Sequence, residues 1–503
     1  MDNLVFIIFG GSGDLTKRKL IPALYNLFRE KRVPHSLTIL GVGRTEFTDI
    51  TYRAHLKKSL LQQLRDDEWN ESMADAFLEC VIYFQMDQTR EEEYIRLKDK
   101  IESVDSGCGN YLFYLATPPV LYEKIPQYIK SSGLNEAVNC GKEKKIRRII
   151  VEKPFGYDLD SALKFNNIFH DVFQEEDIYR IDHFLGKETV QNILALRFAN
   201  GIFEPLWNRN YIERIEITAV ENLGVADRGG YYDTTGALRD MVQNHLVQLL
   251  ALVAMEPPRD YNEKEFRDEV VKVYKSLRPL TDEEIASNVI RGQYTGSTLP
   301  GKKGYREETG VAPKSYTETF LAMKLFIANW RWEGVPFYIR TGKEMPTKVS
   351  EIVVHFKPTP HPLFTGRKNR PEQNQLIIRI QPNEGAVVKL DMKVPGPGFE
   401  IKQVPMDFTY DKLGVLPTED AYSKLIEECM NGEPLLFTRS DAVIESWKYF
   451  DNILKYWKYN NVPLYGYPAG TWGPLESESI ITEGKKWTNP CKNLINTDLY
   501  CEL

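Results

Sequence analysis

The feature that most constrains this chain is an unbroken apolar run, Leu4–Phe9, that stops at Gly10 and Gly11. A short run without a polar interruption is typical of a strand that is buried on both faces of a sheet. Residues 20–30 follow with apolar side chains at a helical spacing. Further strand-like runs occur at residues 37–42, 81–84, 111–116 and 146–151. Strands that are separated by helix-length segments predict a doubly wound parallel sheet.

The loop after the first expected strand has the composition of a phosphate-binding turn. Residues 9–19 read Phe-Gly-Gly-Ser-Gly-Asp-Leu-Thr-Lys-Arg-Lys. Glycine permits a tight turn and close approach of a pyrophosphate, and the helix start offers N–H donors and a positive dipole end. The spacing departs from the strict G-x-G-x-x-G, so an ordinary Gly-rich turn is the alternative. We predict dinucleotide contacts from Gly10, Gly11, Ser12, Gly13, Asp14, Leu15, Thr16 and Lys17.

The residue after the second expected strand indicates which dinucleotide binds. An acidic residue there would hold the ribose 2′-hydroxyl of NAD, but the chain has Arg44. A guanidinium suits the 2′-phosphate of NADP, so NADP is favoured, with a solvated surface arginine as the alternative.

A Walker loop, the other common phosphate-binding motif, is excluded. The segments around Gly186 and Gly342 lack the first glycine of that motif and carry Glu after Lys.

The length of the chain and a change in its sequence pattern predict two domains of different kinds. The chain has 503 residues, enough for roughly two to four domains. Beyond about residue 178 the strand-like runs are joined mostly by turn-rich loops, which favours a mainly antiparallel sheet. The polar, Gly- and Pro-containing residues 278–314 are expected to be a long surface connection. We therefore expect an α/β Rossmann-like dinucleotide-binding domain over 1–180 and a larger α+β domain over 181–503.

Composition argues against several other classes. The net charge is −7, which gives no support for nucleic-acid binding. The longest apolar run, residues 246–255, is shorter than the ~20 residues of a bilayer span, so no membrane partner is expected. The N-terminal apolar run is too short for a secretory signal. Six scattered cysteines without a Cys-x-x-Cys pair predict reduced thiols in a cytoplasmic protein and no metal site.

Three further segments combine charged side chains with neighbouring apolar runs. Residues 152–156 (Glu-Lys-Pro-Phe-Gly) follow an expected parallel strand, where ligands bind. Residues 180–188 read Arg-Ile-Asp-His-Phe-Leu-Gly-Lys-Glu and residues 239–245 read Arg-Asp-Met-Val-Gln-Asn-His. Each also has a structural interpretation, such as a packed histidine or a solvated turn. Asp240 and His245 are five residues apart, or about 140° around a regular helix, so they are not expected to share a face.

Taken with the glycine loop, these segments resemble the glucose-6-phosphate dehydrogenase family, and the similarity runs through most of the chain. It is carried by residues 10–15, 152–156, 180–188, 239–245, 335–343 and 380–384. The segments at 180–188 and 239–245 together are highly specific. The resemblance implies oxidation of carbon 1 of glucose 6-phosphate to 6-phospho-D-glucono-1,5-lactone, with hydride transfer to NADP, as the entry step of the pentose phosphate pathway.

The resemblance also implies roles for individual residues. His245 matches the general base, and Asp182 matches the carboxylate that orients this base. His183 and Lys187 match the ligands of the substrate phosphate. Other matches are Glu221 and Asp240 for sugar hydroxyls, Lys343 and Lys348 for further substrate contacts, Lys19 and Lys153 between cofactor and substrate, and Asp87 and Gln88 on the adenosine side. The family commonly associates through the large sheet of its second domain, so the resemblance implies a homodimer or homotetramer.

Two positions depart from the family pattern, and two other functions stay open. Phe184 stands where most members have Tyr, so a hydroxyl that could donate to the phosphate is absent and weaker phosphate binding is expected. Thr16 stands where the family often has Ala, and its bulk is expected to alter the packing of the loop. An oxidoreductase of an unphosphorylated sugar would not need His183 and Lys187. A non-catalytic NADPH sensor on this scaffold would tolerate loss of His245.

Overall fold

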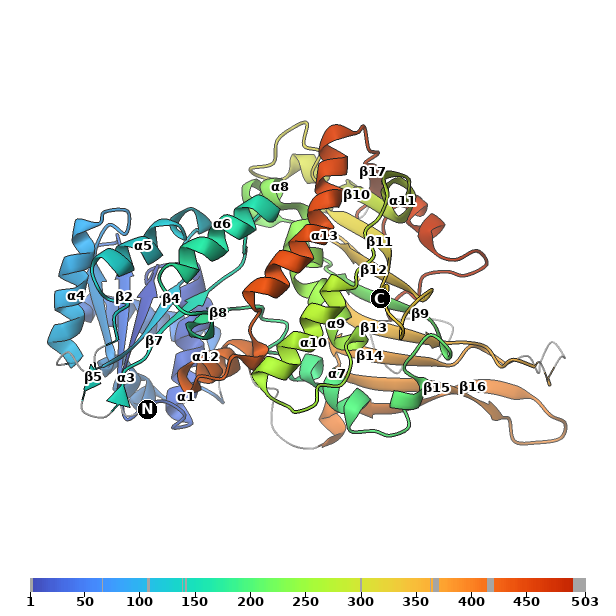
Figure 1. Ribbon diagram of the computed structural model, residues 1–503, viewed down its shortest axis with the longest axis horizontal. Coiled ribbons are helices and arrows are strands. Elements are labelled where there is room, and N and C mark those ends of the chain that lie inside the picture. Colours follow the sequence, from blue (N-terminus) through green and yellow to red (C-terminus); the bar gives the residue numbers. More distant parts are fainter. Residues whose placement is uncertain are drawn as a thin grey trace. The chain divides into compact units, whose positions relative to one another are not determined.

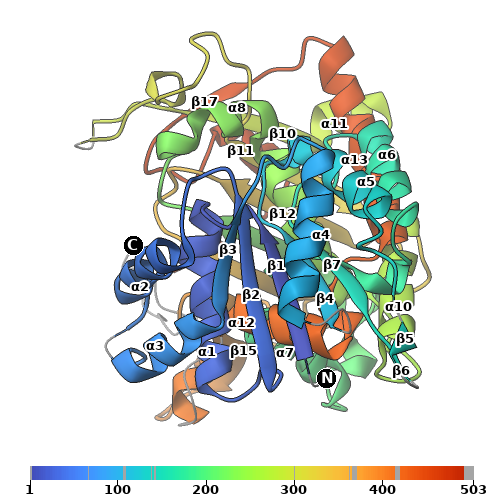
Figure 2. The ribbon, with the colours of Figure 1, turned by 90° about the vertical axis from the view of Figure 1, so that its left-hand side faces the viewer.

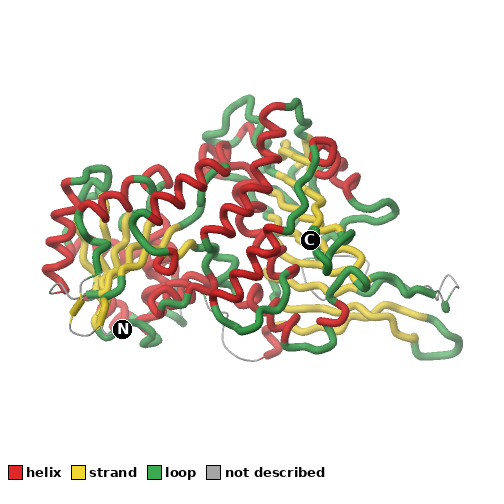
Figure 3. Tube along the Cα trace, viewed as in Figure 1, coloured by secondary structure: helices red, strands yellow, loops and turns green. Residues whose placement is uncertain are grey.

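A computed structural model of the chain describes residues 3–65, 67–105, 109–137, 139–140, 143–298, 301–361, 363–364, 371–413 and 420–491. The chain divides into two compact units, each built from separated stretches of sequence. Unit 1 comprises Met1–Lys187, Arg259–Arg267 and Thr418–Ile444, and unit 2 comprises Glu188–Pro258, Asp268–Pro417 and Glu445–Leu503. Figure 3 traces the helices, strands and loops along the chain.

Unit 1 is built on a parallel sheet. Its strands are β1 (Asn3–Phe9), β2 (Ser36–Gly43), β3 (Val81–Gln85), β4 (Asn110–Leu115), β7 (Arg147–Val151) and β8 (Ile178–Arg180). They lie in the order β3-β2-β1-β4-β7-β8, and all the pairs described run parallel (Figures 1 and 2). The predicted doubly wound sheet is confirmed. The strand order reverses between β1 and β4, and ligands bind beside the carboxyl ends of strands at such a point.

Helices cover the sheet of unit 1, with α4 in front of the strands in Figure 2. Helix α1 packs against α2, α3 and α12, and α5 packs against α6. The elements are η1 (Thr16–Leu20), α1 (Ile21–Arg29), α2 (Asp49–Gln63), α3 (Glu71–Glu79), α4 (Glu92–Asp105), η2 (Pro119–Leu121), α5 (Lys124–Ser131), α6 (Leu159–His170), η3 (Glu175–Asp177), α12 (Ala421–Asn431) and η9 (Pro434–Leu436), with a small hairpin of β5 (Asn139–Cys140) and β6 (Glu143–Lys144). Two helices contribute residues to both units, α10 (Glu263–Lys275) and α13 (Ser440–Tyr459).

Unit 2 is built on a larger mixed sheet. Its strands are β9 (Ile212–Val220), β10 (Val289–Thr295), β11 (Phe320–Phe326), β12 (Pro336–Gly342), β13 (Val349–Phe356), β14 (Gln375–Gln381), β15 (Gly385–Lys393), β16 (Ile401–Thr409) and β17 (Tyr465–Pro468). They lie in the order β16-β15-β14-β13-β9-β12-β11-β10-β17. Among the described pairs, β9–β12 and β10–β17 are parallel and the others are antiparallel. The expected mainly antiparallel sheet is confirmed.

The helical elements of unit 2 include a π-helical segment, η6 (Leu238–Leu246), that leads directly into α9 (Val247–Ala254). The others are α7 (Glu188–Phe198), η4 (Glu204–Leu206), η5 (Ala226–Arg228), α8 (Gly229–Ala237), α11 (Asp282–Asn288), η7 (Tyr305–Glu307), η8 (Tyr410–Leu413) and η10 (Leu475–Ile480). Helix α9 is buried along its whole length, which explains why residues 246–255 read as the longest apolar run of the chain.

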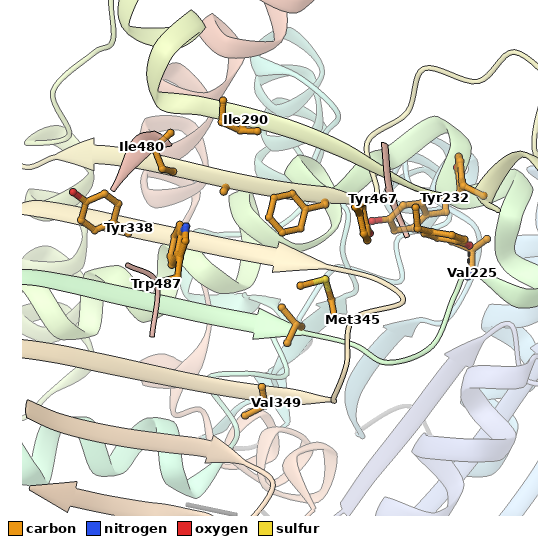
Figure 4. Close-up of a cluster of buried hydrophobic side chains, with 14 of the residues drawn as sticks. Val225, Tyr232, Ile290, Tyr338, Met345, Val349, Tyr467, Ile480 and Trp487 are labelled. Atoms are coloured by element: carbon orange, nitrogen blue, oxygen red, sulfur yellow. Dashed lines mark hydrogen bonds between the residues drawn. The ribbon is translucent and has the colours of Figure 1, made fainter. Parts of the chain in front are cut away.

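An aromatic-rich core packs against the sheet of unit 2 (Figure 4). It includes Tyr232, Tyr338, Met345, Tyr467 and Trp487 among its buried members. The rings of Tyr338 and Trp487 meet edge to face, with centroids 5.8 Å apart. Figure 4 shows Tyr232 and Tyr467 close together at the other end of the cluster. This core supports the ends of β9 and β12, where several predicted site residues lie.

Two sequence expectations about the fold and the cysteines are wrong. Residues 278–314 do not form only a surface connection, because they contain α11 and the buried strand β10. Polar composition misled the prediction since the buried polar side chains of β10 have partners: Gln293 donates to the carbonyls of Ser315 and Thr317, and Arg291 donates to a backbone carbonyl. Cys491 is disulfide-bonded, so the thiols are not all reduced. Spacing along the sequence does not report which sulfurs meet in the fold.

The length and composition of the helices bear on the expectation that no segment crosses a membrane. Within the ranges given above, no helix combines the length and the apolar composition that a bilayer crossing requires.

Candidate active site

The glycine loop of unit 1 is tied to the neighbouring strands. The N–H groups of Gly10 and Gly11 both donate to the Val42 carbonyl at 2.9 Å. Gly10 has a φ of +89°, and a Cβ there would lie 2.3 Å from the Ala116 carbonyl oxygen. At Gly11 a Cβ would lie 2.7 Å from the Cα of Gly41. Glycine is therefore required at both positions, because the loop approaches the backbone beyond β4 and within β2.

Thr16 links the two ends of the glycine loop with a buried side-chain hydrogen bond. Its side chain is fully buried, and Oγ1 donates to the Gly10 carbonyl at 2.9 Å. The N–H of Gly13 donates to the same carbonyl at 2.8 Å. The helix starts with the π-helical turn η1, in which the N–H of Ile21 donates to the Thr16 carbonyl. The Thr16 hydroxyl thus adds a hydrogen bond to the loop that alanine could not make.

Side chains from three other segments hold the loop. Tyr52 of α2 donates its hydroxyl to the Gly11 carbonyl at 2.8 Å, and burial raises the pKa of Tyr52 so that it stays protonated. Thr45 donates to the Ser12 hydroxyl at 2.9 Å. The buried Gln88 amide donates to the Val42 carbonyl at 3.0 Å, so it supports the loop. Sequence reasoning missed Tyr52 and Thr45, because no local pattern links them to the loop.

Charged side chains surround this loop in unit 1. Arg44 follows β2 and is exposed. Asp87 accepts bonds from the backbone N–H and the hydroxyl of Thr89, and these bonds with the nearby Arg90 and Arg44 lower its pKa. Along the loop and η1, Asp14, Arg18 and Lys19 are exposed, and Ser12, Gly13, Leu15 and Lys17 are half-buried. This mostly cationic set of donors suits an anionic dinucleotide.

Glu152 and Lys153 follow β7, which pairs with β4. The Tyr114 hydroxyl donates to Glu152 Oε1 at 2.7 Å. Burial raises the pKa of Glu152, while hydrogen bonds from Tyr114 and Tyr422 and the charge of Lys153 act in the opposite direction. The charge of Asp182 also raises the pKa of Glu152, which places the two carboxyl groups near each other within unit 1.

The segment after β8 forms a tight turn that carries three predicted site residues. Asp182 is 3% exposed, and its Oδ1 accepts the N–H of Phe184 at 2.9 Å. The Leu185 N–H donates to the Asp182 carbonyl at 3.0 Å, and the Lys187 N–H donates to the Phe184 carbonyl at 3.1 Å. Asp182, His183 and Lys187 are therefore held on one compact turn.

Phe184 supplies an aromatic face to this turn. The residue is 3% exposed, and the Lys187 Nζ lies 4.2 Å from its ring centroid. The His183 ring lies 5.2 Å from the same ring. An ammonium over an aromatic face gains about 0.5–2 kcal/mol. Phe184 thus holds the Lys187 ammonium in place without offering a hydroxyl.

In unit 2, Glu221 and Lys343 directly follow two neighbouring parallel strands. Val220 of β9 is paired with Gly342 of β12, so the next residue of each strand lies at the same edge. The Glu221 N–H donates to the Gly342 carbonyl at 2.9 Å, and the Lys343 Nζ forms an ion pair with the Glu221 carboxylate. Lys348 is exposed just before β13, whose first residue pairs with Val220. The sheet therefore gathers these three predicted residues at one edge.

Tyr232 of α8 lies beside this edge and was missed by sequence reasoning. Lys343 Nζ lies 5.0 Å from the centroid of the Tyr232 ring. Burial raises the pKa of Tyr232, and the charges of Asp240 and Glu221 raise it further. Asp240 and Glu221 therefore both lie near this buried phenol. The sequence around Tyr232 carries no motif, so only the tertiary contacts identify it.

His245 and Asp240 lie on the π-helical segment η6, and His245 is 1% exposed. The N–H of Val247 donates to the carbonyl of Val242, five residues earlier. Bonds of this i→i+5 kind stack residues five apart, unlike the four-residue step of an α-helix. The prediction that Asp240 and His245 do not share a face is wrong because it assumed a regular helix. π-helical turns of this kind are frequent at functional sites.

The predicted site residues are divided between the two units. Unit 1 carries the glycine loop with Lys19, Arg44, Asp87, Gln88 and Lys153, and the turn with Asp182, His183 and Lys187. Unit 2 carries Glu221, Asp240, His245, Lys343 and Lys348.

Comparisons with known proteins assign the chain to a family. Residues 7–192 match the family model for the glucose-6-phosphate dehydrogenase NAD binding domain, and residues 194–488 match the C-terminal domain of the same family. The glucose-6-phosphate 1-dehydrogenase of Aggregatibacter actinomycetemcomitans is 48% identical, with 97% of this chain and 98% of the relative covered. That of Treponema pallidum is 44% identical, with 99% and 98% covered. A solved glucose-6-phosphate dehydrogenase in complex with glucose 6-phosphate has a TM-score of 0.87 at 33% identity, with 97% of this chain and 99% of that one covered. The chain therefore belongs to the glucose-6-phosphate dehydrogenase family.

Proposed function

We propose that the protein oxidises carbon 1 of glucose 6-phosphate to 6-phospho-D-glucono-1,5-lactone with NADP as the hydride acceptor. This reaction is the entry step of the pentose phosphate pathway. The observation that carries the proposal is the 48% identity to a glucose-6-phosphate 1-dehydrogenase over 97% of the chain. A match along nearly the whole chain involves both units, so the resemblance is not confined to the dinucleotide-binding part.

The residues of the glycine loop fit NADP. The N–H groups at the start of η1 would bind the pyrophosphate, and Arg44 would bind the 2′-phosphate, with Asp87 and Lys153 as further contacts. The exposed cations Arg44 and Lys19 match the charge of such a ligand. When bound, the nicotinamide accepts the hydride that leaves carbon 1.

His245 is the proposed general base. Its imidazole would take the proton of the carbon 1 hydroxyl as the hydride leaves the same carbon, so that the C–O bond becomes a carbonyl. Asp182 is the proposed carboxylate that orients this base and stabilises its cationic form. The depth of His245 in unit 2, at 1% exposure, supports this role because a buried base is shielded from competing water.

The turn at residues 182–187 is the proposed phosphate site. His183 and Lys187 would each donate to the phosphate, and Lys187 adds a fixed positive charge over the Phe184 ring. Glu221 and Asp240 would accept hydrogen bonds from sugar hydroxyls. Lys343 and Lys348 would donate to the substrate, and Lys19 and Lys153 would contact both substrate and cofactor. The ion pair of Lys343 with Glu221 supports their joint role.

Initial rates of NADPH formation test this function. Rates are measured for glucose and for glucose 6-phosphate, each with NADP and with NAD as the hydride acceptor. The expected result is a much higher kcat/KM for glucose 6-phosphate with NADP. H245N should lower kcat by about 10²–10⁴-fold, the range for loss of a general base. H361N replaces an exposed histidine of the same unit and should keep the wild-type rate.

The same assays separate the alternatives. Equal kcat/KM values for free glucose and its 6-phosphate would indicate an oxidoreductase of an unphosphorylated sugar. Binding of NADPH without any turnover would indicate a sensor. Either outcome would reject the proposed dehydrogenase.

We also propose a homodimer or homotetramer that works in the cytoplasm. Strand β16 is a long edge strand, and its hairpin with β15 exposes Met392, Phe399 and Met406. Exposed apolar side chains on an open edge favour association with another copy. The doubly charged substrate and the dinucleotide do not cross a bilayer freely, which favours an enzyme in the compartment that makes them. Light scattering after gel filtration gives the mass, and a monomer of 58.2 kDa would contradict the assembly.

A further inference from the structure

A buried carboxylate from outside the helix holds the start of η6. Glu318 is 5% exposed, and its Oε1 accepts the N–H of Leu238 at 3.0 Å. Its backbone carbonyl accepts the N–H of Ala237 at 3.0 Å. The first N–H groups of a helix have no partner within the helix, and Ala237 at the N-cap offers no side-chain acceptor. Glu318 therefore supplies the missing cap from the segment before β11.

The backbone before η6 is shaped around this carboxylate. Gly236 has φ +71° and ψ 173°, which breaks the helix between α8 and η6. A Cβ at Gly236 would lie 2.4 Å from Glu318 Oε1 and 2.9 Å from Oε2. A side chain at this position would displace the carboxylate from the Leu238 N–H, and the positive φ itself favours glycine. The helix break and the position of Glu318 thus depend on each other.

The residues on either side of Glu318 are also anchored. The Thr317 hydroxyl donates to the carbonyl of Asp233 in α8 at 2.6 Å. The Thr319 carbonyl accepts the N–H of Lys343 at 3.0 Å. Residues 317–319 therefore connect the helix that carries Asp240 and His245 to the strand end that carries Lys343, all within unit 2.

We propose that Glu318 is a positioning residue, which fixes the start of η6 and thereby the place of His245 relative to Lys343. This inference rests on the proposed roles of His245 and Lys343 in the dehydrogenase reaction. Glu318 does not contact the substrate in this proposal. Its effect reaches the reaction through the helix, because a base that is displaced by about 1 Å can lose 10²-fold in rate.

Substitutions of Glu318 can separate the effect of its hydrogen bond from the effect of its charge. Burial raises the pKa of Glu318, and the Leu238 N–H, Arg291 and Arg239 oppose that shift. Glutamine keeps the length and the acceptor oxygen but carries no charge. Aspartate keeps the charge but is one methylene shorter, so its oxygen cannot reach the Leu238 N–H from the same backbone position.

The test compares E318Q, E318D and E318A in the full-length enzyme. For each variant, kcat and the KM values for NADP and glucose 6-phosphate are measured, together with the isotope effect on kcat when carbon 1 carries deuterium. We expect E318D and E318A to lower kcat about tenfold or more with an unchanged KM for NADP, and to enlarge the isotope effect as the chemical step becomes slower. E318Q should stay within about twofold of the wild type.

Glu216 provides a matched control, because it is another buried carboxylate of unit 2 that accepts a backbone N–H, at 2.8 Å from Thr488. E216A is expected to lower stability but to keep kcat per folded enzyme. The inference is overturned if E318A keeps the wild-type kcat, or if E318Q is as impaired as E318D. If E318A does not fold, the comparison of E318Q with E318D decides. An inactive wild type would reject the proposed function as well, whereas an active wild type with unimpaired E318D and E318A rejects only this inference.

Discussion

Phe184 places an aromatic ring under Lys187 but lacks the hydroxyl that tyrosine would add, so this position should influence the affinity for the substrate phosphate. F184Y restores a donor and keeps the ring under Lys187. One hydrogen bond to a charged group contributes about 1.5–3 kcal/mol, so the KM for glucose 6-phosphate should fall about 10–100-fold. F184L is the control: it keeps an apolar side chain but removes the ring, and its KM should rise. An unchanged KM in F184Y would show that the hydroxyl has no access to the phosphate.

Thr16 is the second informative residue, because its hydroxyl closes the glycine loop on the Gly10 carbonyl. T16A removes a buried hydrogen bond of about 1 kcal/mol. We expect a looser loop and a rise of about fivefold in the KM for NADP, with little change in kcat. T16S keeps the hydroxyl and should behave like the wild type. The measurement is the initial rate at varied NADP; a KM for T16A at or below the wild-type value would contradict the role.

Among the elements, those with a strong local period could be predicted. The uninterrupted apolar runs of β1 and β4 indicate strands buried on both faces, and the structure confirms them. The π-helical form of η6 could not be predicted. Its residues have ordinary helical propensities, and the extra residue per turn is accommodated by contacts far away in sequence, such as the bond from Leu238 to Glu318. β10 was missed for a similar reason, since the partners of its polar side chains lie on other segments.

The π-helical form leads to a prediction at the level of the element. Deleting Arg239 should return the segment to i→i+4 bonds and keep α9 in place, because one residue is the difference between the two patterns. Asp240 and His245 would then be five residues apart in an α-helix, about 140° around its axis, and would no longer share one face. We expect a folded protein, by circular dichroism and thermal unfolding, whose kcat falls by about 10²-fold or more. R239A keeps the residue count and should retain most of the activity. Full activity of the deletion variant would mean that the shared face is not used.

At the scale of the whole molecule, each unit places several of its site residues at the carboxyl ends of parallel strands. In unit 1 these are the loop after β1, Arg44 after β2 and Lys153 after β7, which sequence reasoning placed from the strand pattern. In unit 2 the parallel pair β9–β12 puts Glu221 beside Lys343. That pairing joins strands about 120 residues apart, so the motif resemblance was needed to single out both residues. Tyr52, Tyr232 and Glu318 had no such motif, and only the tertiary contacts reveal them.

The large sheet of unit 2 also contains buried charges, which make its stability depend on pH. Glu216 is 1% exposed and binds Arg214 Nε at 2.9 Å, His355 Nε2 at 3.0 Å and the Thr488 N–H. Burial alone would raise the pKa of Glu216, but these partners outweigh it and lower the pKa from 4.5 to about 2. Burial lowers the pKa of His355, so its neutral ring donates to the carboxylate.

Because the folded-state pKa of Glu216 lies below its unfolded value, the stabilisation is fully present above pH 4.5 and is lost as the pH falls towards 2. A shift of this size corresponds to at most roughly 3 kcal/mol. E216Q should therefore lower the Tm strongly at neutral pH, and the difference from the wild type should shrink as the pH falls from 4.5 to 2. E123Q, which removes the exposed partner of Lys164, should leave the Tm unchanged. Thermal unfolding across this range measures both variants, and a Tm difference for E216Q that does not vary with pH would show that Glu216 stabilises the sheet by packing and not by its charge.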